Sequence, residues 1–154
     1  METLSPASVR EVVGFNIGLW AFDRYVQHGD WAYINLNTIK ENFKHGFIWD
    51  NDQLGTNTFL HPYNGSLYYA AGRSNGFNYW QSELFAIAGS AMWELFMECE
   101  YPSTNDVIAT PIGGAVLGET RHDLSHHIIL YRHLSRTPLR HKRNCRHNSH
   151  TYTE

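Results

Sequence analysis

The chain has 154 residues and a net charge of −3, with 42% hydrophobic and 18% charged residues. This length suits one domain with a substantial core and is too short for two domains of ordinary size. Neither Cys99 nor Cys145 belongs to a CxxC or zinc-type spacing, which argues against a disulfide scaffold or a zinc domain.

The first residues do not have the pattern of a secretory signal peptide. Glu2, Pro6 and Arg10 stand where such a peptide has a basic start and an unbroken apolar run. The sequence therefore predicts either a cytoplasmic chain or a native N-terminus that lies further upstream.

A first helix is predicted over residues 9–27, which are apolar around most of the helix circumference. Ser5 or Ser8 is the expected cap, because a serine hydroxyl can accept a hydrogen bond from a free backbone amide of the first turn. Gly14 and Gly18 form a small-xxx-small pair, so we expect another helix to approach closely there.

Two further helices follow. Residues 34–47 have apolar side chains at four-residue spacing on one face, which predicts a short amphipathic helix. Residues 56–73 predict a helix that starts or breaks at His61-Pro62, with a stop signal at Ser74-Asn75-Gly76.

The strongest helical pattern runs over residues 78–98, and another helix is predicted over residues 105–119. Ser103 or Thr104 is expected to cap that last helix, and Gly114 and Gly118 give it a second smooth face. The predicted fold is therefore all-α, a compact bundle of four to five short helices.

The longest charge-free apolar runs cover residues 84–93 and 107–118. A membrane span needs about 20 apolar residues, so these runs predict core helices or short segments embedded at a membrane surface.

Charge and composition change abruptly after Glu119. Residues 1–119 carry 13 acidic and five basic residues, whereas residues 120–154 carry seven basic and two acidic ones. Seven of the ten histidines lie in the second part, and every tryptophan, phenylalanine and glycine lies in the first. The sequence thus predicts a helical domain over 1–119 and a His- and Arg-rich tail over 120–154, irregular or disordered and with no nucleic-acid partner.

The candidate catalytic residues are His61, Arg73, Glu94, Glu98 and Asp106. Glu94 and Glu98 are four residues apart on one helix face, where like charges repel unless a positive group or a proton intervenes. If the carboxylates are buried, a hydrolytic or metal site between helices is possible, although the Glu-x-x-His pair of di-metal bundles is absent. The alternative is structural: Glu94 pairs with Arg73 or a backbone amide, and Glu98 is solvated.

A metal site stays undecided at this stage, and no cofactor is expected. The chain contains neither GxxxxGK[ST] nor GxGxxG, the glycine-rich patterns that bind nucleotide phosphates.

Several pieces in order carry a family likeness: DNDQ at 50–53, HPYNGSLYYAAGRSNGFNYW at 61–80, GSAMWELFMECEYPSTND at 89–106 and IGGAVLGE at 112–119. They resemble an uncharacterised domain of Gram-negative cell-envelope proteins, in which the domain follows a signal peptide and precedes a β-rich outer-membrane region. The resemblance covers residues 14–119 and implies localisation in the cell envelope, in the periplasm or outer membrane. Because it ends in mid-helix, we interpret the residues after Glu119 as the product of a reading-frame shift or as a chance extension, and the chain as a fragment with an aberrant C-terminus.

The leading functional hypothesis is a non-enzymatic, membrane-proximal helical module that packs against membrane lipid or an envelope protein domain. Its apolar contacts are expected from five aromatic residues: Trp20, Tyr68, Tyr69, Trp80 and Trp93. The alternative is an envelope hydrolase that acts on lipid or cell wall. The hydrolase requires the five candidate polar side chains to converge around a cleft.

Overall fold

The computed structural model describes residues 5–49 and 54–136. The regular secondary structure of these residues is helical, with one isolated parallel bridge between Ile48 and Ser103 and no strand, so the predicted all-α fold is confirmed. The helices in chain order are α1 (Pro6–Phe22), α2 (Leu36–His45), α3 (His61–Ser74), α4 (Tyr79–Phe96) and α5 (Thr104–Arg136). Shorter turns are the π-helical η1 (Asp23–Gln27) and η3 (Thr56–Leu60) and the 3₁₀ turn η2 (Asp30–Ala32).

Local capping chemistry fixes where the helices begin. Ser5 caps α1, as predicted, with its hydroxyl accepting from the Ala7 amide at 3.3 Å. Asn35 and Asn78 cap α2 and α4 in capping boxes, in which a side chain three residues later also bonds the cap residue's backbone amide. At α5, the Ser103 hydroxyl accepts from the Asp106 amide at 3.2 Å.

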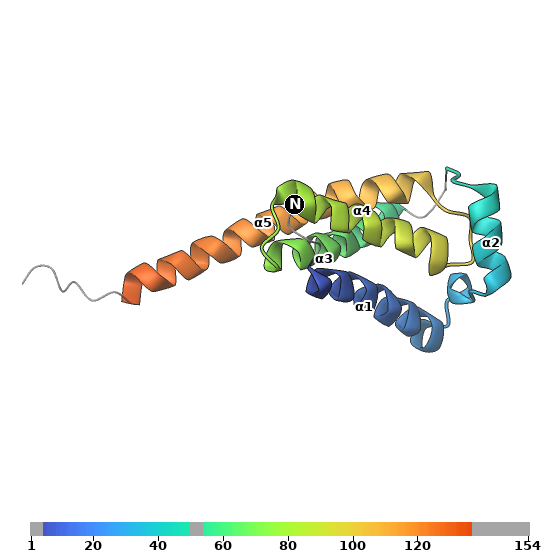
Figure 1. Ribbon diagram of the computed structural model, residues 1–154, viewed down its shortest axis with the longest axis horizontal. Helices are drawn as coiled ribbons and strands as arrows, with labels where there is room; N and C mark the ends of the chain where they lie inside the picture. Colours follow the sequence, from blue (N-terminus) through green and yellow to red (C-terminus); the bar gives the residue numbers. More distant parts are fainter. Residues whose placement is uncertain (1–4, 50–53, 137–154) are drawn as a thin grey trace, which may run out of the picture. The chain divides into compact units, whose positions relative to one another are not determined.

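Helix α3 is the central element of unit Met1–His122, because it contacts α1, α4 and the first half of α5 (Figure 1). Its backbone comes very close to α5: a Cβ atom added at Gly65 would overlap the Thr110 carbonyl, and one added at Gly114 would lie 2.7 Å from the Gly65 Cα. Gly118 similarly makes room for the Tyr69 ring. The predicted smooth face at Gly114 and Gly118 is therefore confirmed.

The predicted close approach at Gly14 and Gly18 is wrong. Both residues are exposed on α1, and among the described residues nothing lies within 4 Å of a Cβ atom added at either position. The spacing of small residues alone did not show which face of the helix points inward.

The last helix is longer than predicted. It continues past Glu119 as far as Arg136, because residues 120–136 contain no glycine or proline and include several good helix formers. The part of the predicted tail over 137–154 lies outside the described residues. The chain divides into two units, Met1–His122 and Asp123–Glu154.

The interior of the first unit is small and strongly polar. Its apolar cluster centres on Tyr68 and Tyr69, which are almost completely buried. Around them the buried groups include serines, asparagines and carboxylates, among them Asn16, Asn42 and Glu94. A core of this kind depends on hydrogen bonds between helices as much as on apolar burial.

Candidate functional site

Glu94 lies near the C-terminal end of α4 and is 1% exposed. Its Oε2 accepts a hydrogen bond from the Ser103 backbone amide at 2.7 Å, which holds the start of α5 against α4. Nearby, Asn42 of α2 donates its amide hydrogens to the carbonyls of Glu94, at 3.4 Å, and Glu98, at 3.2 Å. These carbonyls are at the helix end, where no intrahelical amide reaches them, so Asn42 caps α4 from outside.

The Glu94 and Glu98 side chains hydrogen-bond to each other. Burial, followed by the negative charge of Glu94 and that hydrogen bond, raises the pKa of Glu98 well above its ordinary value. The Trp93 indole, which donates to Glu98 Oε2 at 3.1 Å, offsets this in part.

His61 lies between two groups of α5. Its Nε2 is 3.6 Å from Asp106 Oδ1, and its Nδ1 is 3.2 Å from the Thr110 hydroxyl. With the proton on Nε2 facing Asp106, Nδ1 accepts from Thr110, which gives a carboxylate–imidazole–hydroxyl chain. Asp106 and Thr110 are each 3% exposed, so this chain lies in the interior.

Ser103 joins the two groups. Its amide binds Glu94 and its hydroxyl accepts from the Asp106 amide. The structure thus brings four of the five predicted residues, His61, Glu94, Glu98 and Asp106, into one largely buried polar network. The structural alternative for Glu94 is correct in part, since its partner is a backbone amide. Glu98 is half-buried and its carboxyl group accepts a hydrogen bond from the Trp93 indole, so it is less solvated than expected.

Arg73 lies in a separate cluster. Its Nε is 2.9 Å from Glu119 Oε2 and its Nη2 donates to Oε1 at 3.1 Å, while Nη1 donates to the Phe77 carbonyl at 2.9 Å. The buried Tyr69 hydroxyl donates to the same carboxylate at 2.5 Å. Burial, with this hydrogen bond and the carboxylate charge, raises the pKa of Tyr69. The cluster ties α3 to α5, and Arg73 does not reach the Glu94 network through any of these contacts.

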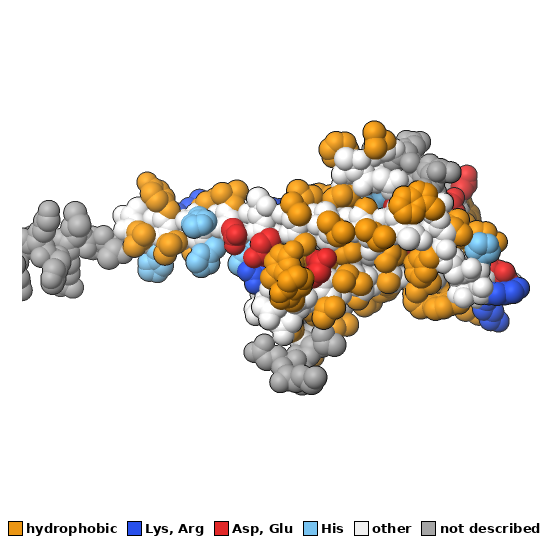
Figure 2. Space-filling view, turned by 90° about the horizontal axis from the view of Figure 1, so that it is seen from above, with side chains coloured by type: hydrophobic (Ala, Val, Ile, Leu, Met, Phe, Trp, Pro, Cys, Tyr) orange, Lys and Arg blue, Asp and Glu red, His pale blue; other side chains and the backbone are white. Residues whose placement is uncertain are grey.

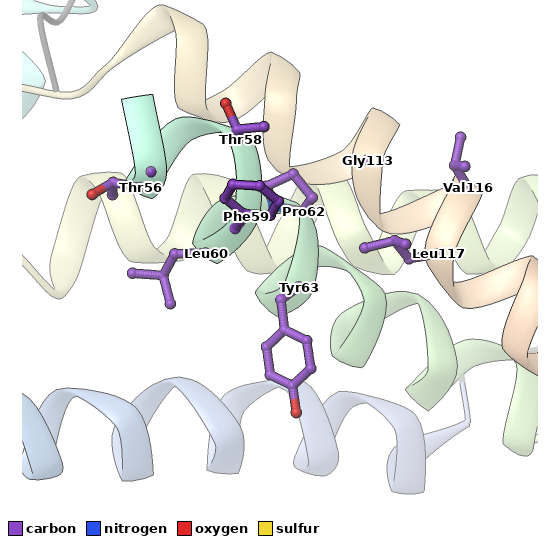
Figure 3. Close-up of a pocket in the computed structure, with 10 residues that line it drawn as sticks. Thr56, Thr58, Phe59, Leu60, Pro62, Tyr63, Gly113, Val116 and Leu117 are labelled. Carbon is purple, nitrogen blue, oxygen red and sulfur yellow. The ribbon is translucent and has the colours of Figure 1, made fainter. Parts of the chain in front are cut away.

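A groove lies on another part of the same unit, with a volume of about 950 Å³. Its walls come from residues 55–63 and 113–117, and they include Phe59, Pro62, Val116 and Leu117 (Figure 3). None of the five predicted polar residues lines this groove. The hydrolase hypothesis required a cleft surrounded by those residues, whereas the groove is apolar.

Sequence reasoning missed Asn16 and Asn42, both within α-helices and both almost fully buried. Asn16 donates to the Gly89 carbonyl at 3.1 Å and accepts from the Tyr68 hydroxyl at 2.5 Å. A signal was present in the sequence, because an asparagine within an apolar helical run is costly to bury without partners. The hydrogen-bond partners of the two asparagines depend on how the helices pack, so they could not be predicted from the sequence.

The fold and its polar interior define a small all-helical domain held together by hydrogen bonds between helices. The sequence model of the family described as "Domain of unknown function (DUF3943)" matches residues 46–144, and the chain belongs to this family. The match continues past Glu119, so the prediction that the resemblance ends there is wrong. No curated protein and no solved structure gave a match to the chain.

Proposed function

We propose that this chain is a non-enzymatic helical module of the cell envelope whose apolar exterior lies against membrane lipid. The observation that carries the proposal is the distribution of side chains in the first unit. Polar groups such as Glu94, Asp106 and Asn16 are buried, whereas large apolar residues are exposed on every helix. A domain that is surrounded only by water has the opposite preference.

The exposed apolar residues form stripes. On α5, Ile108, Ile112 and Val116 recur every four residues and are 50 to 63% exposed. On α4, Trp80, Leu84 and Ile87 follow one another at spacings of four and three residues and are 41 to 75% exposed. Hydrophobic side chains cover much of the face shown in Figure 2, with charged groups in a few places. Patches of this extent mark surfaces that bind lipid or protein.

The interior supports the same proposal. In a lipid environment the hydrophobic effect contributes little to the association of helices. Such helices therefore pack through small residues at their crossings and through hydrogen bonds between helices. The Gly65–Gly114 crossing and the Asn16–Tyr68 bond are of this kind. No described helix has the length and hydropathy of a membrane span.

Of the five aromatic residues expected to make the outer contacts, Trp80 is exposed, and Trp20 and Trp93 are partly so. Tyr68 and Tyr69 were predicted wrongly for this role, since they form the core. The exterior contacts of the proposal therefore come from Trp80 and the aliphatic stripes.

The hydrolase alternative is not proposed further. Its carboxylate and histidine groups would have to reach a substrate, and Glu94, Asp106 and Thr110 are at most 3% exposed. Their bonds to backbone amides and to each other account for their burial without a reaction.

The test is flotation of the purified chain with vesicles of phosphatidylethanolamine and phosphatidylglycerol on a density gradient. We expect the chain to float, and an α5 variant with Ile108, Ile112 and Val116 changed to glutamine to float less. A matched variant with Lys40, Glu41 and Lys44 of α2 changed to glutamine should float as the native chain does. Recovery of the native chain at the bottom of the gradient, as a folded monomer or as a complex with itself, would refute the proposal.

A further inference from the structure

An apolar groove lies between η3, the start of α3 and α5 in the first unit. We propose that it binds one hydrocarbon chain of a membrane lipid. This inference rests on the proposed function, in that it names a particular lipid contact within the apolar exterior.

Charge is the first argument. No Asp, Glu, Lys or Arg occurs in residues 54–72 or 107–118, the two stretches that contain the lining residues. The polar side-chain groups of the lining are the hydroxyls of Thr56, Thr58 and Tyr63. A groove without charge is complementary to an uncharged chain and offers no counter-ion to an ionic ligand.

Shape is the second argument. The close crossing of α3 and α5 at Gly65 and Gly114 brings the two walls together, and Gly113 lets α5 rest directly on Pro62. On one side the π-helical turn η3 carries Phe59 and Leu60, which are 73% and 52% exposed, and on the other Leu117 projects from α5 (Figure 3). The volume of about 950 Å³ lies within the range of small-ligand sites, roughly 300 to 1,000 Å³.

The π-helical turn is itself informative. Turns of this type are rare, interrupt the regular hydrogen-bond ladder, and occur frequently at functional sites. Here Thr56–Leu60 form the turn, and four of these five residues line the groove. The turn thus places side chains around the groove that a regular helix would direct elsewhere.

A hydrocarbon chain fits this lining better than a peptide does. A peptide in extended conformation would bring amide groups into the groove, and a partner helix would bring polar side chains at its edges. Two threonine hydroxyls and one tyrosine hydroxyl satisfy few of these groups, and each unsatisfied one is costly. A hydrocarbon chain needs no such partner.

The experiment uses hexadecanoic acid carrying a photoreactive diazirine in its chain, added to the full-length protein below its micelle concentration. After irradiation, the labelled peptides are identified by mass spectrometry. We expect label to concentrate on residues 54–63 and 113–117. In the Val116→Glu variant, labelling should fall about tenfold or more, because a carboxylate in an apolar groove disfavours the chain.

Ile112→Glu is the matched control. Ile112 lies one turn before Val116 on α5 and is 60% exposed against 63%, but it does not line the groove. Its labelling should equal that of the native protein, and circular dichroism should show both variants equally helical. Equal loss in the two variants, or label spread evenly over Leu84, Ile87 and the other exposed apolar residues, overturns the inference. Flotation with vesicles is scored separately, so a protein that floats without groove labelling refutes the groove alone.

Discussion

The crossing of α3 and α5 gives the sharpest prediction about stability. Substitution of Gly65 by alanine adds a Cβ atom that would overlap the Thr110 carbonyl oxygen and lie 2.8 Å from its carbonyl carbon. Both are backbone atoms of α5, so no side-chain rotation can relieve the overlap. The two helices must move apart, which also disturbs the neighbouring Gly114 contact.

The magnitude follows from two opposing effects. Alanine favours a helix over glycine by about 1 kcal/mol. Overpacking a well-packed interior costs about 1–3 kcal/mol and more where only backbone can move. We therefore expect Gly65→Ala to lower the free energy of unfolding by about 2 kcal/mol or more. Gly14→Ala, with nothing within 4 Å, should raise it by about 0.5–1 kcal/mol.

Urea denaturation followed by circular dichroism, with all variants in the same buffer or detergent, measures both changes. The pair is informative because both substitutions are identical in chemistry and both lie in helices. If the two variants have the same free energy of unfolding, α3 and α5 do not cross as closely as described.

Three further predictions concern the polar groups. In the unfolded chain Glu98 loses its proton near the ordinary pKa of glutamate, whereas in the folded chain it loses it at higher pH. The free energy of unfolding should therefore fall as the pH rises through that interval. The Glu98→Gln variant should lack this dependence. Arg73→Ala and Glu119→Gln, in a double-mutant cycle of urea midpoints, should show a coupling of about 1–2 kcal/mol, because the ion pair is only partly exposed. Asn16→Ala should cost about 2 kcal/mol or more, and Tyr68→Phe about 1 kcal/mol, because the first removes the bond to the Gly89 carbonyl as well and leaves the buried Tyr68 hydroxyl without its acceptor.

Each of these has a result that contradicts it. Glu41→Gln, exposed on α2, is the control for Glu98, and an unchanged pH dependence in Glu98→Gln would mean that the fold does not raise the pKa of Glu98. Additive effects in the Arg73–Glu119 cycle would remove the proposed link between α3 and α5. Equal costs at Asn16 and Tyr68 would show that the Gly89 contact contributes nothing.

The helices could largely be predicted from the sequence because their signals are local. Asn78, the stop at Asn75-Gly76 and the cap at Ser103 each act within a few residues, and the structure has helix ends at these points. The end of α5 could not be placed by the change in charge at Glu119. Charge composition says little about whether a backbone stays helical, whereas the absence of glycine and proline does.

The candidate site was predicted in part. Helical spacing placed Glu94 and Glu98 on one face, and the structure has the two carboxyl groups close enough for the Glu94 charge to raise the pKa of Glu98. Sequence could not show that Arg73 bonds Glu119, because that choice depends on the α3–α5 packing. Nor could it reveal the groove, which arises from the crossing of two stretches that are about 50 residues apart.

The most direct test of the account is the depth of individual side chains at a bilayer. Spin labels would be attached at Leu84 and Ile108, on the apolar stripes, and at Lys40, in a chain with Cys99 and Cys145 changed to alanine. With vesicles present, the account predicts that Leu84 and Ile108 become accessible to oxygen dissolved in the bilayer and shielded from an aqueous nickel complex, while Lys40 stays accessible to nickel. Labels at all three positions that remain equally accessible to nickel would contradict it.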